Sequence, residues 1–200
     1  MNRKVIIPRH FDKRKDGYAM KTSSFTYDLF RYYGKRGESL KNRLSRPLEI
    51  KYLRTFRKVQ ESSNRLAKLY YKLKLRRLSA KSQIQIPSGT KIGKGFYIGH
   101  SGRIIINPAA VLGENVNIAT GVTIGQENRG KRAGVPTIGD RCWIGTNAVI
   151  VGNIKIGNDV LIAPLSFVNF DVPDHSVVVG NPAKIIHRDN ATEDYINNTI

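Results

Sequence analysis

Residues 138–168 read IGDRCW IGTNAV IVGNIK IGNDVL IAPLSF V when the chain is divided into groups of six. Each group begins with an aliphatic residue, and the same spacing recurs upstream in two shorter series. The three series are Ile86, Ile92, Ile98 and Ile104; Leu112, Ile118 and Ile124; and Ile138, Ile144, Ile150, Ile156, Ile162 and Val168. A period of six fits neither a 3.6-residue helix nor a half-buried strand. It indicates short strands that turn every six residues and stack as a solenoid.

Two other positions of the hexad are also patterned. A glycine follows the aliphatic residue in seven hexads, and we expect it to take the turn, because glycine adopts positive φ at little cost. These glycines are Gly93, Gly99, Gly113, Gly125, Gly139, Gly145 and Gly157. A small or β-branched residue often stands four positions after the aliphatic one, as at Val116, Val122, Cys142, Ala148, Ile154, Val160 and Ser166. We expect the aliphatic residue and the residue four positions after it to point inward, so that stacked coils share one core.

Cys142 therefore reads as a small core residue rather than as a nucleophile. It is also the only cysteine, which excludes a disulfide framework within the chain.

Several short motifs of the repeat region point to a known family. They are YIGH at 97–100, GVTIG at 121–125, GNIKIG at 152–157, VPD at 172–174 and VGNPAK at 179–184. With these motifs, residues 86–188 resemble the hexapeptide-repeat acyltransferases, in particular serine acetyltransferases and the related O-acetyltransferases of bacterial surface polysaccharides. The resemblance implies a left-handed parallel β-helix with three hexads per coil, a homotrimer, and acetyl-CoA as the acetyl donor.

The predicted fold class is mainly β: a left-handed parallel β-helix of hexapeptide repeats with a basic α-helical N-terminal extension. We expect the extension at 1–82, the β-helix at 83–188, and a polar, partly disordered tail at 189–200. Neither a signal peptide nor an apolar run long enough to cross a bilayer is present in the sequence, so we expect a cytoplasmic protein.

The N-terminal extension carries helical patterns and much positive charge. One short helix is expected at 24–33 and two at 47–79, joined near the N-cap candidates Ser62, Ser63 and Asn64. Their apolar stripes are Ile50, Leu53, Phe56 and Val59, and Leu66, Leu69, Tyr70 and Leu73. The net charge of +19 indicates an anionic partner.

Two interpretations of these helices stay open. They pack on the β-helix or a neighbouring subunit with solvated basic faces, or they lie peripherally on the anionic inner face of a membrane. No nucleic-acid-binding motif accompanies the positive charge, so we do not expect nucleic acid as a binding partner.

The hexads are interrupted twice. Ile104 to Leu112 is two residues longer than one hexad, and the irregular piece runs from 99–103 through Asn107 and Pro108. Residues 126–135 put Ile124 and Ile138 out of step. Insertions in a solenoid become loops on one face, often the binding face. Both breaks therefore predict one functional edge, with His100 facing the long loop one coil later.

His100 is the predicted catalytic residue. The resemblance implies a general base at this position, and a neutral imidazole can take the proton of a hydroxyl that attacks a thioester. The alternative is a turn histidine with only local hydrogen bonds. The family carries an Asp where this chain has Gln85, another where it has Gly99, and a second His where it has Val135. A backbone carbonyl, Glu127 or a neighbouring subunit would then have to orient the imidazole, and the departures favour an acceptor other than serine.

The resemblance also implies where the substrates bind. Acetyl-CoA would lie between coils of adjacent subunits, against the turns 145–148 and 163–166. The residues predicted to bind it are Gly125, Lys131, Arg132, Gly145, Thr146, Ala163 and Lys184, with the basic side chains meeting phosphates. The residues predicted to bind the acceptor are Gln85, Asn107, Glu127, Asn128 and Arg129. No metal is expected, because His10, His175 and His187 lack ligand spacing.

The sequence thus favours an O-acetyltransferase that moves acetyl from acetyl-CoA to a hydroxyl of a sugar in a bacterial surface polysaccharide or its precursor. Serine O-acetyltransferase and a non-catalytic trimeric β-helix scaffold remain as alternatives.

Overall fold

The computed structural model describes residues 23–200, so His10 and the rest of 1–22 lie outside the described residues. The described residues begin with helices. They are α1 (Ser24–Tyr33), the 3-10 helix η1 (Gly34–Arg36), α2 (Leu40–Leu44), α3 (Leu48–Glu61) and α4 (Arg65–Ser82). Of these, α1, α3 and α4 form where the sequence predicts them, whereas η1 and α2 were not predicted. The predicted break between α3 and α4 is confirmed, since Oδ1 of Asn64 accepts a hydrogen bond from the backbone N–H of Ala67 and caps α4.

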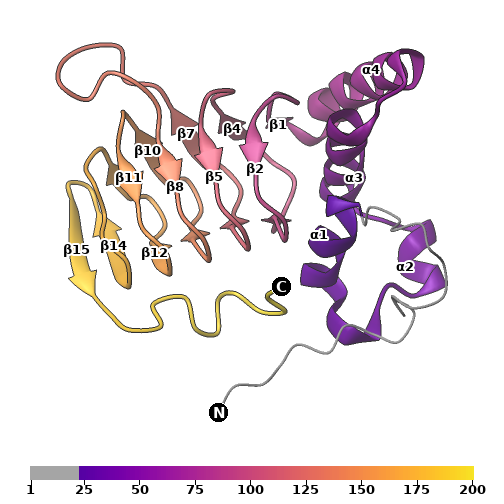
Figure 1. Cartoon of the computed structure of the whole chain (residues 1–200). Coiled ribbons are helices and arrows are strands. Elements are labelled where there is room, and N and C mark those ends of the chain that lie inside the picture. The colour runs from indigo at the N-terminus through magenta and orange to yellow at the C-terminus, as the bar shows by residue number, and fades with distance from the viewer. Residues whose placement is uncertain (1–22) are drawn as a thin grey trace, which may run out of the picture.

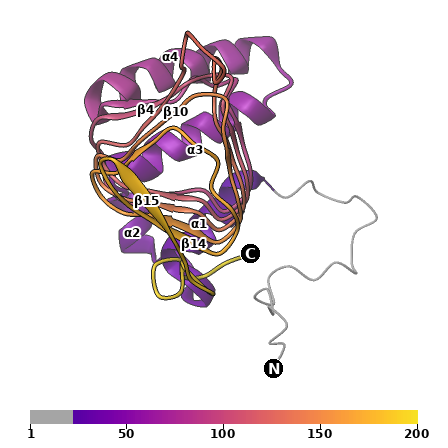
Figure 2. The same cartoon turned by 90° about the vertical axis from the view of Figure 1, so that its left-hand side faces the viewer.

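The rest of the chain coils into three parallel sheets that form the sides of a triangular prism (Figures 1 and 2). The first face contains β1 (Ile84–Gln85), β4 (Ile104–Ile106), β7 (Thr123–Gly125), β10 (Val149–Val151) and β13 (Phe167–Val168). The second face contains β2 (Lys91–Ile92), β5 (Val111–Leu112), β8 (Thr137–Ile138) and β11 (Lys155–Ile156). The third face contains β3 (Tyr97–Ile98), β6 (Asn117–Ile118), β9 (Trp143–Ile144), β12 (Val160–Ile162), β14 (Ser176–Gly180) and β15 (Ala183–His187).

Each coil crosses the first, second and third face in turn, and among the strands named here only the closing pair β14–β15 is antiparallel. The predicted fold class, a β-helix with a helical N-terminal extension, is confirmed.

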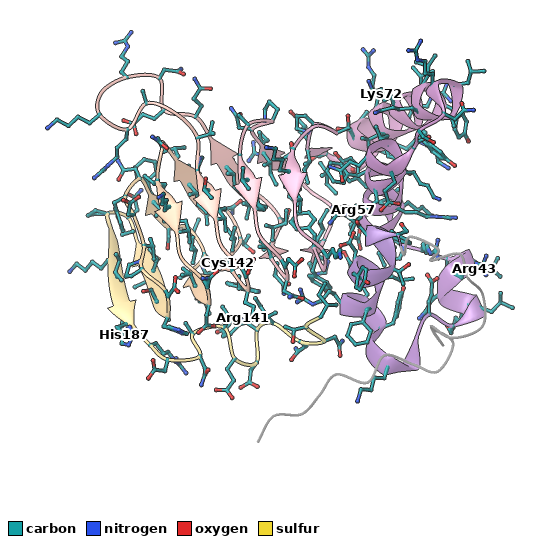
Figure 3. The ribbon with its side chains drawn as sticks, viewed as in Figure 1. Arg43, Arg57, Lys72, Arg141, Cys142 and His187 are labelled. Carbon is teal, nitrogen blue, oxygen red and sulfur yellow. The ribbon has the colours of Figure 1, made fainter. Side chains whose placement is uncertain are left out.

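The core is a column of hexad residues running along the prism axis. Ile98, Ile118, Ile144 and Ile162 are stacked on the third face and are at most 1% exposed. The residues four positions after the hexad aliphatic are buried as well, including Cys142, which Figure 3 shows in the middle of the coils. Burying each such aliphatic side chain stabilises the fold by roughly 1.5–3 kcal/mol.

Helices α1 and α3 close the N-terminal end of this column. Tyr52 and Phe56 of α3 are buried, and the Tyr52 hydroxyl donates to the carbonyl of Ile86 at 2.9 Å. The buried guanidinium of Arg57 (labelled in Figure 3) pairs with Asp28 of α1 at 2.7 Å and donates to the carbonyl of Gly93 at 2.6 Å. The extension is therefore joined to the first coil by both apolar and ionic contacts.

The role predicted for the hexad glycines is wrong. None of the seven has a positive φ; the left-handed residues stand three positions after the aliphatic one, as at Asn115, Arg141 and Asn147. Five of them, Gly93, Gly113, Gly139, Gly145 and Gly157, are instead packed under the backbone of the next coil, so that a Cβ on Gly139 would lie 2.6 Å from the carbonyl oxygen of Gly157. Close stacking of coil on coil, rather than turn conformation, requires glycine here.

The first break in the repeat lies within the irregular stretch predicted from Gly99 to Pro108, at its start. The register pairs Ile106, not Ile104, with Ile124 of the next coil. Ile104 takes the buried place two residues earlier, as Val122 does before Ile124. The two extra residues therefore lie between Ile98 and Ile106, in the turn that carries His100.

The predicted disorder of the tail is also wrong. Residues 189–200 run back along the coils towards α1, in yellow in Figure 1. The buried carboxylate of Asp159 accepts hydrogen bonds from the backbone N–H groups of Ala191 and Thr192 and from the Thr192 hydroxyl. The Tyr195 ring packs on Trp143 with centroids 4.9 Å apart. These contacts order a segment whose composition alone suggested disorder.

None of the helices described in 23–200 combines the length and the apolar character needed to cross a bilayer.

Candidate active site

His100 lies on a turn that is wider than its counterparts. The turn spans residues 99–103 between β3 and β4, where the third face meets the first; the next coil crosses this edge with residues 119–121. We call this edge, formed by 99–103, 119–121, 145–147 and 163–165, the His100 corner. The imidazole is exposed, and no residue in 23–200 forms a hydrogen bond to it. It is free to meet a substrate.

Two hydrogen bonds fix the residues that follow His100 in the turn. The N–H of Gly102 donates to the carbonyl of Ser82 at 2.9 Å, and the Ser101 hydroxyl donates to Glu49 of α3 at 2.8 Å. Gly102 has φ +147° and lies against Thr120, so a side chain there would collide. The helical extension thus fixes the turn that presents His100.

Strand β3, which leads into the turn, is fixed by a tyrosine. The Tyr32 hydroxyl donates to the carbonyl of Ile98 at 2.8 Å and accepts from its N–H at 3.0 Å. Burial raises the pKa of Tyr32 well above its usual range, so the hydroxyl stays protonated and can donate.

An open groove of about 930 Å³ runs along the His100 corner beside the end of α4. It is lined by Arg76, Ser79, Ala80, Gln83, Gln85, Gly102, Arg103, Thr120, Gly121 and Asn147. The lining offers two guanidinium groups together with amide and hydroxyl groups, and it includes no carboxylate. Such a surface can hydrogen-bond a polyhydroxyl compound or an anion, but it has no anionic partner for an ammonium group.

Three residues predicted to bind acetyl-CoA lie at the same corner. Gly145 and Thr146 follow β9, and Ala163 follows β12, each in the turn between the third and first faces. The N–H of Leu165 donates to the carbonyl of Thr146 at 2.9 Å and joins these two turns. The structure therefore brings His100 and the predicted acetyl-CoA turns to one edge. Gln85, predicted for the acceptor, lines the groove there.

The long loop lies at a different edge. Residues 126–135 connect β7 to β8, where the first face meets the second; this loop corner also contains 107–110 and 152–153. Figure 1 shows the loop projecting at the upper left. The N–H of Asn153 donates to the carbonyl of Arg132 at 2.8 Å, which fixes the loop to the next coil.

The remaining predicted residues are accordingly separated from His100. Asn107, Glu127, Asn128, Arg129, Lys131 and Arg132 lie at the loop corner, Gly125 ends β7 next to it, and Lys184 lies on β15. The prediction of one functional edge, with His100 facing the loop, is wrong within one chain. The turn at 99–103 joins the third face to the first, whereas the loop at 126–135 joins the first face to the second, so the two lie at different corners of the prism. Glu127 does not orient the imidazole in this structure.

Sequence reasoning did not identify Glu49, Ser101, Arg76 or Arg103 as parts of the site. Glu49 and Arg76 are brought in by helices more than twenty residues away in the chain, and no local motif marks them. Arg103 lies in the irregular stretch that the broken period indicated, so that stretch was the available signal.

The interpretation of Cys142 as a core residue is confirmed. Burial raises the pKa of its thiol to about 12, and the thiol donates to the carbonyl of Gly157 at 3.1 Å. A protonated, inaccessible thiol is not a nucleophile.

Comparison with known proteins supports the resemblance seen in the motifs. Residues 136–169 match the family model "Bacterial transferase hexapeptide (six repeats)". The chain resembles the hexapeptide-repeat acyltransferases. Serine acetyltransferase 4 of Arabidopsis thaliana is 44% identical over 112 residues, which are 55% of this chain and 31% of the relative. A serine acetyltransferase of Staphylococcus aureus (strain Mu50) is 43% identical over 108 residues, 53% of this chain and 50% of the relative.

This chain thus spans half or less of the length of these curated relatives. Among solved structures, serine acetyltransferase of Brucella abortus in complex with coenzyme A matches with a TM-score of 0.68 at 27% identity, covering 82% of this chain and 67% of that one. The soybean serine acetyltransferase apoenzyme matches with a TM-score of 0.68 at 29% identity, covering 82% and 68%. Because the structural match covers more of the chain than the sequence match, the similarity extends beyond the repeats.

Proposed function

We propose that this protein transfers an acetyl group from acetyl-CoA to a hydroxyl group, with His100 as the general base. The observation that carries the proposal is the exposed His100 imidazole on a widened turn, beside a polar groove and at the same corner as the predicted acetyl-CoA turns. The similarity to serine acetyltransferases, one of them solved with coenzyme A, supports the same chemistry.

His100 would act on the acceptor. A neutral ring nitrogen takes the hydroxyl proton as the oxygen attacks the thioester carbonyl, so that a C–O bond forms and the C–S bond breaks. The imidazolium then returns its proton to the departing thiolate, which leaves an ester, free CoA and a neutral His100. A positioned base of this kind contributes about 10²–10⁴ in rate.

The comparisons favour L-serine as the acceptor, since the relatives are serine acetyltransferases. The Arg76 and Arg103 guanidinium groups of the groove suit its carboxylate.

A second candidate acceptor is a sugar hydroxyl of a bacterial surface polysaccharide or its precursor. The groove favours it, because serine also carries an ammonium group and no carboxylate lines the groove. Gln85 and Gly99 stand where the family's acidic residues would be. Amide and hydroxyl groups such as those of Gln85, Thr120 and Asn147 suit a neutral or acidic sugar.

We also propose a homotrimer in which Lys131 and Arg132 of one loop approach the acetyl-CoA turns of a neighbouring subunit. In this arrangement the loop corner of one subunit would lie beside the His100 corner of its neighbour.

The test is release of free CoA thiol from acetyl-CoA in the presence of L-serine, neutral sugars or uronic acids. His100→Asn and His100→Ala should lower turnover by roughly 10²–10⁴ and leave acetyl-CoA affinity within a few fold. His187→Asn, an exposed histidine on β15 (Figure 3), is the matched control and should stay active. A His100 variant with near-native turnover would show that another group is the base. A folded wild-type protein that binds acetyl-CoA but releases no thiol with any acceptor would favour the scaffold.

A further inference from the structure

Helix α4 has two apolar faces, and the fold uses only one of them. Its inner face, with Tyr71, Leu75 and Leu78, packs against the core. The outer face carries Leu66, Leu69, Tyr70 and Leu73, whose exposed fractions are 78%, 56%, 59% and 56%. Their spacing of three, four and seven residues places them in one stripe. No part of 23–200 buries this outer stripe, and an exposed apolar stripe marks an interaction surface.

The charges on α4 are all of one sign. The helix contains seven basic residues and no acidic one: Arg65, Lys68, Lys72, Lys74, Arg76, Arg77 and Lys81. By helical spacing, Arg65, Lys72 and Arg76 flank the outer stripe on one side, and Lys74, Arg77 and Lys81 on the other. No salt bridge described in 23–200 involves them. The outer stripe is therefore bordered by unneutralised cations.

The face is also accessible. Figure 1 shows α4 at the end of the molecule, away from the closing strands β14 and β15, and Figure 3 shows Lys72 projecting from α4 away from the coils. The four side chains of the outer stripe are each more than half exposed, so a partner can contact them.

We propose that the outer face of α4 docks on an anionic lipid bilayer. Leu66, Leu69 and Leu73 enter the boundary between headgroups and acyl chains, and the flanking lysines and arginines contact acidic headgroups. Long basic side chains suit this position, because their stems lie along the apolar surface while their charges stay at the headgroups. A second copy of the same face fits less well, since it would oppose six cations to six and supply no carboxylate.

Docking has a consequence for the groove. Arg76, Ser79 and Ala80 of α4 line it, so a bilayer bound to the outer stripe would hold the groove beside the lipid surface.

The test is sedimentation of the full chain with vesicles of phosphatidylcholine, alone or mixed with phosphatidylglycerol. Binding should require the anionic lipid and weaken with salt, because the Debye length falls from about 10 Å at 0.1 M to about 3 Å at 1 M. The triple variant Leu66→Ser, Leu69→Ser, Leu73→Ser should lose binding by about tenfold or more. Its control, Val179→Ser with Ile186→Ser, changes exposed apolar residues at the opposite end of the coil and should bind like the wild type.

Charge is tested separately. Arg65→Gln, Lys72→Gln and Lys74→Gln together should reduce binding to anionic vesicles, whereas Lys91→Gln with Lys155→Gln, on exposed positions of the second face, should not. Thermal unfolding checks that each variant is folded. In Tyr70→Trp, the added indole emission should shift to shorter wavelength with anionic vesicles.

Three results would overturn the proposal. The first is equal binding to neutral and anionic vesicles. The second is unchanged binding by the folded leucine variant. The third is an oligomer of the wild-type protein, seen by light scattering without lipid, that dissociates in the leucine variant. That result would show that a second copy of the chain covers the stripe.

Discussion

Ser101, on the turn that carries His100, donates a hydrogen bond of 2.8 Å to Glu49, which lies 52 residues earlier in α3. Together with the bond from Gly102 to Ser82, it joins the widened turn to the helical extension. The extension therefore positions the proposed base as well as closing the core.

Removing this bond should reduce turnover without unfolding the protein. In Ser101→Ala the turn loses its contact with α3, and a hydrogen bond to a charged group is worth about 1.5–3 kcal/mol, so we expect kcat to fall by about tenfold. The KM for acetyl-CoA should change little, and the dependence of the rate on pH should persist, because His100 remains. Steady-state kinetics measure both. Ser63→Ala, an exposed serine between α3 and α4, is the control. An unchanged kcat would show that the turn needs no support from Glu49.

Gly139→Ala should destabilise the β-helix because its Cβ would lie 2.6 Å from the carbonyl oxygen of Gly157 in the next coil. We expect the free energy of unfolding to fall by about 1–3 kcal/mol or more, as in an overpacked core. Gly99→Ala is the matched control, since the nearest atom to its Cβ would be 3.7 Å away. Urea unfolding measures the free energy of unfolding of both variants and of the wild type. Equal losses would mean that close stacking on Gly157 is not the reason for glycine at position 139.

The tail should detach in acid. Burial raises the pKa of Asp159, but hydrogen bonds from Thr192, His175 and the backbone of Ala191 outweigh it and leave the pKa below its usual value. The carboxylate therefore contributes stability that is fully present above the ordinary Asp pKa of about 3.9 and is lost as the pH falls through the folded-state pKa. Amide hydrogen exchange of 189–200 should quicken over that range.

A variant tests the same contact at neutral pH. Asp159→Asn turns one acceptor into a donor that opposes the N–H groups of Ala191 and Thr192, so exchange in the tail should quicken even at pH 7. Asp189→Asn, an exposed carboxylate, should leave exchange unchanged. A tail that stays protected in Asp159→Asn would show that other contacts hold it, namely the packing of Tyr195 on Trp143 and the hydrogen bond of 2.8 Å that the Arg31 guanidinium donates to the carbonyl of Asn197.

Complementation should show whether the site is shared between subunits. Replacing 126–135 by Gly-Ser should leave the thermal midpoint nearly unchanged but lower turnover, since the loop adds no core. Because His100 and the loop lie at different corners, mixed trimers of this variant with His100→Ala should recover part of the activity. Light scattering measures the assembly and thiol release the activity. A monomer mass at micromolar concentration, or mixtures no more active than their parents, would contradict a shared site.

The sequence by itself determined the repeat and most of the core. The six-residue period identified a solenoid of short strands, which the resemblance to a known family specified as a β-helix. The four-residue offset placed Ala148 and Cys142 inside, and the capping residue Asn64 divided two helices. These features are periodic or local, so neighbouring residues suffice to specify them. The same reasoning placed His100, Gly145 and Ala163 on turns that the structure brings to one corner. The proposed domain limits at 82 and 188 stay a prediction.

The tertiary structure alone decided the features that depend on contacts between coils or between coil and helix. Stacking of Gly139 under Gly157 showed why glycine is needed there, and the register of Ile106 with Ile124 narrowed the predicted irregular stretch to the His100 turn. Asp159 ordered the tail, and Glu49 and Arg76 reached the His100 corner from helices. Each of these contacts joins residues far apart in the chain, and their partners follow from how the coils stack in three dimensions rather than from any local pattern.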